Sequence, residues 1–195
     1  MCRFTSYNLP SFVWTFLSVI AAITCSIGIY FSNWIERDAV NGNVNAMSSY
    51  RVCIGHGKIS LGCDSYLSFG DIFSPEWQAC TIMLGCGACL LILVALTSLF
   101  GLCVRKLFNL VICIIIVSSQ VLAVLLFVVS LVIFPAGWDE PEVQEFCGTD
   151  SGSYNLGDCR IGWAYILTIG GTVIAAVAAS ISWCTKKHKD EYELP

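Results

Sequence analysis

Charged side chains are scarce in this sequence, and their scarcity indicates the class of protein that it encodes. Asp, Glu, Lys and Arg make up 12% of the 195 residues, against about 25% in soluble proteins. They are missing altogether from residues 4–35, 77–104, 107–138 and 161–185. Each stretch exceeds the roughly 20 residues that a helix needs to cross a bilayer. The sequence therefore predicts an all-α membrane protein with four transmembrane helices, at about 11–34, 77–104, 107–134 and 161–185.

The missing charges also exclude functions. Ten basic residues against fourteen acidic ones give a net charge of -4, which leaves no broad basic surface for nucleic acid. The four stretches hold no Asp, Glu, Lys, Arg or His, so nothing in them supports ion or proton transport. No residue pattern predicts a catalytic, cofactor or metal site, and we expect a protein that is not an enzyme.

The charges that are present predict how the chain is oriented. Six basic and three acidic residues lie at the chain ends and in the turn at 105–106, whereas the loops at about 35–76 and 135–160 carry four basic and eleven acidic residues. Basic residues favour the cytosolic side of a membrane. We therefore expect a multi-pass plasma-membrane protein with cytosolic N- and C-termini and two extracellular loops.

Cysteine is abundant, and its placement agrees with this orientation. Cys53 and Cys63 lie in the first extracellular loop, and Cys147 and Cys159 lie in the second. Extracellular cysteines commonly form disulfides. We favour one disulfide within each loop, although four cysteines allow two other pairings. A zinc site at Cys53, His56 and Cys63 would need reduced thiols and a fourth ligand, so we do not favour it.

The remaining cysteines lie in or near the predicted helices. Three lie near the cytosolic face and are candidates for reversible palmitoylation: Cys2, Cys103 and Cys184. The Cys86-Gly87-Ala88-Cys89 sequence has the spacing of a thiol oxidoreductase. Cys86 lies ten residues beyond Glu76, about 15 Å into the bilayer and far from the loop cysteines. A membrane thiol oxidoreductase is therefore only a remote alternative function.

Local patterns predict structure inside both loops. Residues 49–54 and 58–63 are typical of two short strands around a turn at Gly55-His56-Gly57. In the second loop, Asp139 and Glu142 resemble a capping box, which predicts a short helix that reaches Cys147 and ends at Gly148.

Two features inside the predicted helices indicate close packing. Small residues recur every four positions in the first and fourth helices, at Ser18, Ala22, Ser26, Thr168, Thr172, Ala176 and Ser180. Such faces let helices approach closely in lipid, and packing within the bundle is favoured over a dedicated partner-docking face. Gln120 lies deep in the third helix, where we expect its amide to form an interhelical hydrogen bond. The alternative is that this polar residue marks a pathway through the membrane.

Two sets of motifs resemble known tetraspan proteins. Tyr50-Arg51-Val52-Cys53 and Cys63, with Trp34 upstream, resemble the first-loop signature of claudin-like proteins, although claudins carry tryptophan at the place of Tyr50. The more specific set is Phe134-Pro135-Ala136-Gly137-Trp138, Cys147-Gly148, Tyr154, Leu156-Gly157-Asp158-Cys159 and Gly162-Trp163-Ala164. This set resembles the lipoma HMGIC fusion partner-like family of tetraspan membrane proteins, and segments 68–72, 77–79 and 169–173 most resemble its second member.

The resemblance implies a fold and a role. The fold is a left-handed bundle of four transmembrane helices with a small extracellular antiparallel sheet, built mostly from the first loop. The role is that of an auxiliary subunit or chaperone that assists trafficking, assembly or gating of an ion channel or receptor. The expected partners are the lipid bilayer, such a channel or receptor, and a second copy of the chain. Claudin-like cell adhesion is the alternative.

We expect partner contacts at large side chains of the second loop, on the assumption that they are exposed. The candidates are Trp138, Phe146, Tyr154 and Leu156. Aromatic anchors often dominate protein interfaces.

Overall fold

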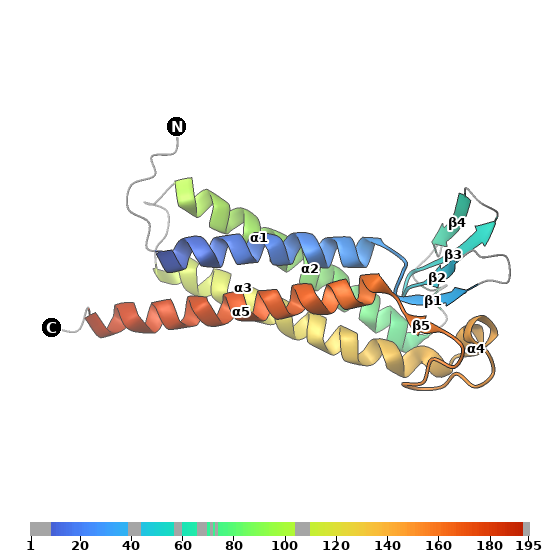
Figure 1. The fold of residues 1–195 in the computed structure, drawn as a ribbon. Coiled ribbons are helices and arrows are strands. Elements are labelled where there is room, and N and C mark those ends of the chain that lie inside the picture. Colours follow the sequence, from blue (N-terminus) through green and yellow to red (C-terminus); the bar gives the residue numbers. More distant parts are fainter. Residues whose placement is uncertain are drawn as a thin grey trace.

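The structure, a computed structural model, describes residues 9–38, 44–56, 60–65, 70, 72, 74–103 and 110–192. Figure 1 shows four long helices side by side, with a small cap of strands and short helices at one end. The long helices are α1 (Leu9–Tyr30), α2 (Pro75–Cys103), α3 (Leu110–Ile133) and α5 (Trp163–Tyr192). The start of α1 and the end of α5 lie together at the end away from the cap (Figure 1).

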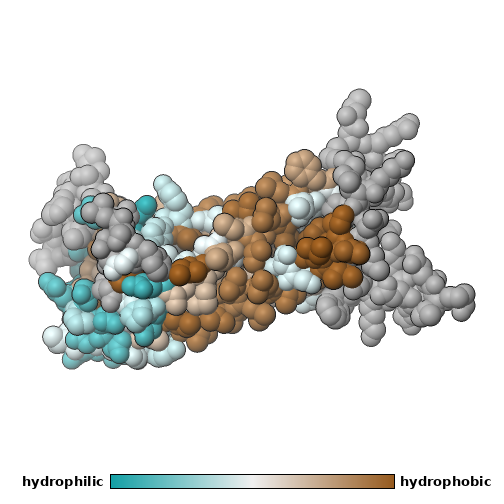
Figure 2. Space-filling model, turned by 180° about the vertical axis from the view of Figure 1, so that it is seen from behind, coloured by the Kyte–Doolittle hydropathy of each residue, from teal (hydrophilic) through white to brown (hydrophobic). Residues whose placement is uncertain are grey.

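Each long helix holds an apolar segment long enough to cross a membrane. The segments are Ser11–Tyr30, Pro75–Gly101, Val111–Asp139 and Trp163–Ile181; the third continues past the end of α3 into the 3-10 helix that follows it. Their outer faces expose large apolar side chains such as Phe16, Leu125 and Ile166, and Figure 2 shows a broad hydrophobic surface that begins where the hydrophilic cap ends. Soluble proteins rarely expose apolar patches of this extent, whereas lipid solvates them. The chain is therefore a multi-pass membrane protein.

The helices end at places that the lack of charge did not predict. α1 stops at Tyr30 rather than near residue 34, because the chain folds back and the Trp34 indole donates to the Gly28 carbonyl oxygen at 2.8 Å. α2 begins at Pro75, two residues before the uncharged stretch but where the Ser74-Pro75-Glu76 sequence predicts the start of a helix. α5 continues past residue 185 to Tyr192, since a helix that has left the membrane can carry charged side chains.

A five-stranded antiparallel sheet forms one part of the cap, with strand order β4-β3-β2-β1-β5. Its strands are β1 (Ile35–Asp38), β2 (Val44–Met47), β3 (Arg51–His56), β4 (Ser60–Ser65) and β5 (Arg160–Ile161). Four strands come from the first loop, as the resemblance implied. The hairpin prediction was partly wrong: β3 continues through Gly55 and His56, which pairs with Ser60, because the cross-strand ladder extends beyond the expected turn.

The second loop forms the other part of the cap. It contains a 3-10 helix, η3 (Phe134–Asp139), and the short helix α4 (Pro141–Cys147). As predicted, α4 ends at Gly148, whose φ of 96° is readily accessible to glycine. The capping box was wrong, because Glu140 is the N-cap and forms no side-chain cap bond. Asp139 belongs to η3, and its carbonyl oxygen accepts a hydrogen bond from the Gln144 side chain.

Small residues let α1 and α5 pack closely against each other. Ser18, Ala22, Thr168 and Thr172 are all buried. A Cβ atom at Gly171 would lie 2.6 Å from the Cys25 sulfur. Packing within the bundle is thus the interpretation that these residues support. The predicted stripe is less regular than expected, since Ala176 is half-buried and Ser180 is exposed.

Gln120 forms the interhelical hydrogen bonds predicted from the sequence. Its side chain is completely buried. The amide oxygen accepts from the Trp14 indole at 2.8 Å, and the amide nitrogen donates to the Ser18 hydroxyl at 3.2 Å and the Ala175 carbonyl oxygen at 3.3 Å. One polar residue of α3 thereby joins α1 and α5.

Candidate interaction surface

A cluster of aromatic rings fixes the cap onto the bundle. Phe134 is completely buried at its centre, with ring centroids 4.9 Å from Trp34, 4.9 Å from Trp77 and 5.6 Å from Tyr165. The Trp77 indole also donates to the Phe134 carbonyl oxygen at 3.1 Å. Because these rings come from different parts of the chain, their packing sets the position of the cap relative to the helices.

The cap also satisfies the backbone at the end of α1. The last four carbonyl groups of a helix lack partners inside it. Here Trp34 donates to Gly28, and the Tyr50 hydroxyl lies 2.7 Å from the Ile29 carbonyl oxygen and 3.0 Å from that of Tyr30. The hydroxyl of a tyrosine at position 50 can therefore satisfy the carbonyl groups at the end of α1. Burial raises the pKa of the Tyr50 phenol, against the opposing charge of Arg51, so the hydroxyl keeps its proton at neutral pH.

Two disulfides brace the cap, with the pairing favoured from the sequence. Cys53 is joined to Cys63 across the β3–β4 hairpin. Cys147 is joined to Cys159, which ties the end of α4 to the segment before β5. Both thiols of the alternative zinc site are therefore consumed by a disulfide.

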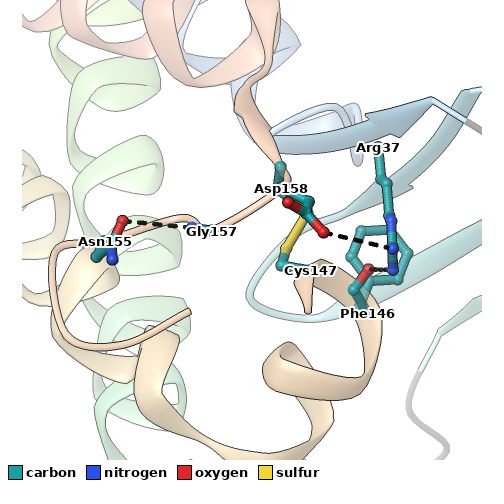
Figure 3. The surroundings of a disulfide bond; sticks show 7 residues. Arg37, Phe146, Cys147, Asn155, Gly157 and Asp158 are labelled. Carbon is teal, nitrogen blue, oxygen red and sulfur yellow. Dashed lines mark hydrogen bonds and ion pairs between the residues drawn. A yellow bond between two sulfur atoms is a disulfide. The ribbon is translucent and has the colours of Figure 1, made fainter. Parts of the chain in front are cut away.

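Arg37 connects the first loop to the second beside the Cys147–Cys159 disulfide. Its guanidinium donates to the Phe146 carbonyl oxygen and lies 3.9 Å from the Asp158 carboxylate. Phe146 and Asp158 each precede one of the two cysteines, so Arg37 faces both ends of the covalent link (Figure 3). Together these bonds hold β1, α4 and the chain that leads to β5 in one arrangement.

Arg160 makes the second charged connection between the loops. Its guanidinium lies 3.2 Å from Glu36 and 3.2 Å from Asp38. The Glu36 carboxylate is nearly buried and also accepts from the Asn33 amide at 3.0 Å. The third arginine of the described cap, Arg51, has its guanidinium over the Tyr30 and Tyr50 rings. All three cap arginines that the structure describes therefore contact other parts of the same chain.

Acidic residues, by contrast, accumulate around α4. Asp139, Glu142 and Glu145 are exposed, and Glu140 is half-buried. Burial, and then the negative charges of Glu76, Asp139 and Glu142, raise the pKa of the Glu140 carboxyl above its usual value. We call residues 139–145 the acidic face of the cap. Its exposed carboxylates make it electronegative.

The structure corrects the predicted partner contacts. Trp138 is 5% exposed, because its ring packs edge-on against Phe134; it belongs to the core of the cap, so the assumption that it is exposed was wrong. Phe146 and Leu156 are half-buried against the same core. Tyr154 is exposed as expected, and its hydroxyl donates to the Val132 carbonyl oxygen at 3.0 Å. The accessible surface is therefore more charged and less aromatic than the sequence indicated.

The motif residues of the second loop serve its close packing. Pro135 is buried in η3, and a Cβ atom at Gly137 would lie 2.6 Å from the Trp77 ring. Gly157 has a φ of 56°, and a Cβ atom there would lie 3.0 Å from the Cys147 carbonyl oxygen. Trp163 is partly exposed at the start of α5, with its ring 5.0 Å from that of Phe31.

The cysteines outside the disulfides lie in several environments. Cys86 and Cys89 are free and lie on the exposed side of α2 within its membrane-spanning segment. Cys25 and Cys80 are buried between helices, and Cys113 is half-buried. Of the palmitoylation candidates, Cys2 lies outside the described residues, and the side chains of Cys103 and Cys184 do so as well.

Comparison with known proteins decides the family. The sequence matches the model of the family described as "Lipoma HMGIC fusion partner-like protein" over residues 10–186. The chain belongs to the lipoma HMGIC fusion partner-like family. Among its relatives, LHFPL tetraspan subfamily member 2a protein of Danio rerio is 34% identical over 88% of this chain and 84% of its own length. LHFPL tetraspan subfamily member 2 protein of Homo sapiens is 32% identical, over 88% and 85%.

A more distant relative is human LHFPL tetraspan subfamily member 4 protein, which is 28% identical over 88% of this chain and 69% of its own length. Membership of the lipoma HMGIC fusion partner-like family agrees with the four membrane-spanning helices and makes the chain a tetraspan membrane protein. The matched region includes the cap, both disulfides and the aromatic cluster.

Proposed function

We propose that this tetraspan protein is a non-enzymatic auxiliary subunit, which assists trafficking, assembly or gating of a larger ion channel or receptor in the plasma membrane. In this proposal the cap faces the extracellular side and contacts a basic surface of the partner through its acidic face. A second copy of the chain is a further partner to be tested. The proposal does not require any chemical step by the chain.

The acidic face carries the proposal. The three arginines of the described cap contact other groups of the chain, so they do not neutralise Glu142 and Glu145, which are exposed on α4. The acids are presented on a cap held by two disulfides and an aromatic cluster. A surface that is ordered before binding loses little conformational entropy when it binds. Inside the membrane, the amide of Gln120 is fully engaged in packing, which supports a scaffold rather than a transport pathway.

Crosslinking in native membranes tests the proposal. The full-length chain, with an affinity tag, is expressed in cells, crosslinked with a membrane-impermeant reagent that joins amines to carboxylates, and purified in mild detergent. Mass spectrometry should recover a channel or receptor subunit. Glu142→Lys should lower the recovery several-fold, because it places a positive charge against a basic surface. Asp64→Lys makes the same charge change at an exposed position of β4 and should leave recovery unchanged.

Two results would count against the proposal. Crosslinking that recovers no channel or receptor, with the chain present at the cell surface, would remove the auxiliary role. Aggregation of cells that express the chain, together with crosslinks only to copies on neighbouring cells, would establish adhesion instead.

A further inference from the structure

A groove lies between α1 and α2 within the bilayer. The groove is open to one side and has a volume of about 350 Å³. Ala22 of α1 and Ala95 of α2 lie at its base, where they are only 5% and 7% exposed. Ile27, Ile92 and Leu96 form its walls and are 40%, 41% and 47% exposed. Small buried residues flanked by large exposed ones leave a furrow that opens away from the bundle.

The chemistry of the groove restricts what can occupy it. Eight of its nine lining residues are apolar, and the ninth, Ser26, presents no polar surface to the groove, so no hydrogen-bonding group there faces the hydroxyl of a sterol or the head group of a lipid. Its volume lies at the low end of the roughly 300–1,000 Å³ found for ligand pockets.

We propose that this groove holds one acyl chain of a phospholipid, with the head group outside the groove at the membrane surface. The walls are continuous with the lipid-facing surfaces of α1 and α2, so the groove opens directly into the hydrocarbon region. Association inside a bilayer depends on van der Waals packing rather than on the hydrophobic effect. A flexible acyl chain can follow the groove and contact both helices. The proposal rests on the membrane-spanning fold alone and is independent of any auxiliary role.

Photochemical labelling tests the proposal. The full chain is reconstituted in phosphatidylcholine vesicles that contain a phosphatidylcholine with a diazirine near the middle of one acyl chain. After illumination, peptides are mapped by mass spectrometry. Labelling should concentrate on residues 19–27 and 92–99 rather than on the exposed face of α3, and excess unlabelled phosphatidylcholine should compete for it.

Variants distinguish an acyl chain bound in the groove from the surrounding lipid. Ala95→Phe fills the base of the groove and should lower labelling of both segments roughly fivefold, because the acyl chain loses its contacts with the base of the groove. Gly85→Phe adds the same side chain to the same helix at an exposed position with no neighbouring atom within 4 Å of the added Cβ. It should leave labelling unchanged. If Ala95→Phe does not fold, Leu96→Ala serves instead, since it removes a lipid-exposed wall and should also lower labelling.

Three results would count against the acyl-chain proposal. Equal labelling of the outer faces of all four helices, or groove labelling that persists in folded Ala95→Phe and Leu96→Ala, would overturn the proposal. Crosslinks from the groove to a second copy of the chain in place of lipid would overturn it as well.

Discussion

Polar side chains inside the membrane join the helices of this bundle through hydrogen bonds. Gln120 has partners in two other helices, and Trp14 and Ser18 have Gln120 as a partner in return. Without water, a polar group that loses its partner finds no replacement. The hydrogen bonds of Gln120 are therefore expected to contribute to the free energy of unfolding of the bundle.

Replacing Gln120 tests this contribution. Gln120→Leu should lower the free energy of unfolding by about 1–2 kcal/mol, because interhelical hydrogen bonds in membranes contribute roughly 0.6 to 1.7 kcal/mol each. Thermal unfolding in detergent, followed by tryptophan fluorescence, measures the change. Ser118→Leu, two residues away and exposed, is the control and should unfold at the wild-type temperature. Equal stability of both variants would contradict the structural role.

Glu140 makes the stability of the cap depend on pH. Its pKa in the folded chain is raised above the ordinary value of 4.5, so ionisation costs the folded state more than the unfolded state. The stabilising contribution of the protonated carboxyl is complete below pH 4.5 and is lost as the pH rises through the raised pKa. Glu140→Gln should therefore be slightly more stable than wild type at pH 7, and the two should converge at low pH.

The same carboxyl can be tested without loss of a helix cap, since Glu140 forms no side-chain cap bond. Unfolding of the disulfide-intact cap is followed at several pH values. Asp64→Asn, on β4 at the far edge of the sheet from α4 (Figure 1), is the charge-matched control. A stability difference for Glu140→Gln that stayed constant from pH 4 to pH 7 would exclude this titration.

At the scale of elements, the close approach of α1 and α5 depends on glycine. A Cβ atom at Gly171 would meet Cys25 and Thr24, at 2.6 Å and 2.7 Å, whereas one at Gly170 would meet nothing within 4 Å. The two glycines are neighbours in sequence, but one faces α1 and the other faces lipid. They provide a matched pair of variants.

Gly171→Ala should destabilise the bundle by about 1–3 kcal/mol, the usual cost of adding a methyl group to a packed interior. Gly170→Ala should cause no loss, because the site is open and alanine favours a helix. Unfolding in detergent and the rate of proteolysis between α1 and the cap measure the effect. A similar loss in both variants would show that helix packing is not the cause.

At the scale of the whole molecule, four spans place the start of α1 and the end of α5 on one side of the membrane and the cap on the other (Figure 1). The basic residues near the spans favour the cytosol for the ends. Tags attached before α1 and after α5 should both bind antibody only in permeabilised cells. A tag inserted at 57–59, between β3 and β4, should bind in intact cells. Any other pattern of antibody binding would contradict the proposed orientation of the chain in the membrane.

The sequence by itself determined the features that depend on composition and on short spacing. Uncharged stretches predicted four spans because charge is costly in lipid, and two closely spaced cysteines in each loop predicted the two disulfides. The position of Gln120 deep in a predicted span also predicted an interhelical hydrogen bond, although not its partners.

Only the tertiary structure decided the features that depend on contacts between distant segments. Trp138 is buried because Phe134 and its neighbours enclose it. Arg37 faces the second disulfide because β1 lies beside α4. The Tyr50 hydroxyl bonds to the last carbonyl groups of α1 because the first loop returns to the end of that helix. The groove between α1 and α2 likewise combines residues about 70 positions apart. Burial and partnership are properties of three-dimensional packing, and a local pattern of residues does not contain them.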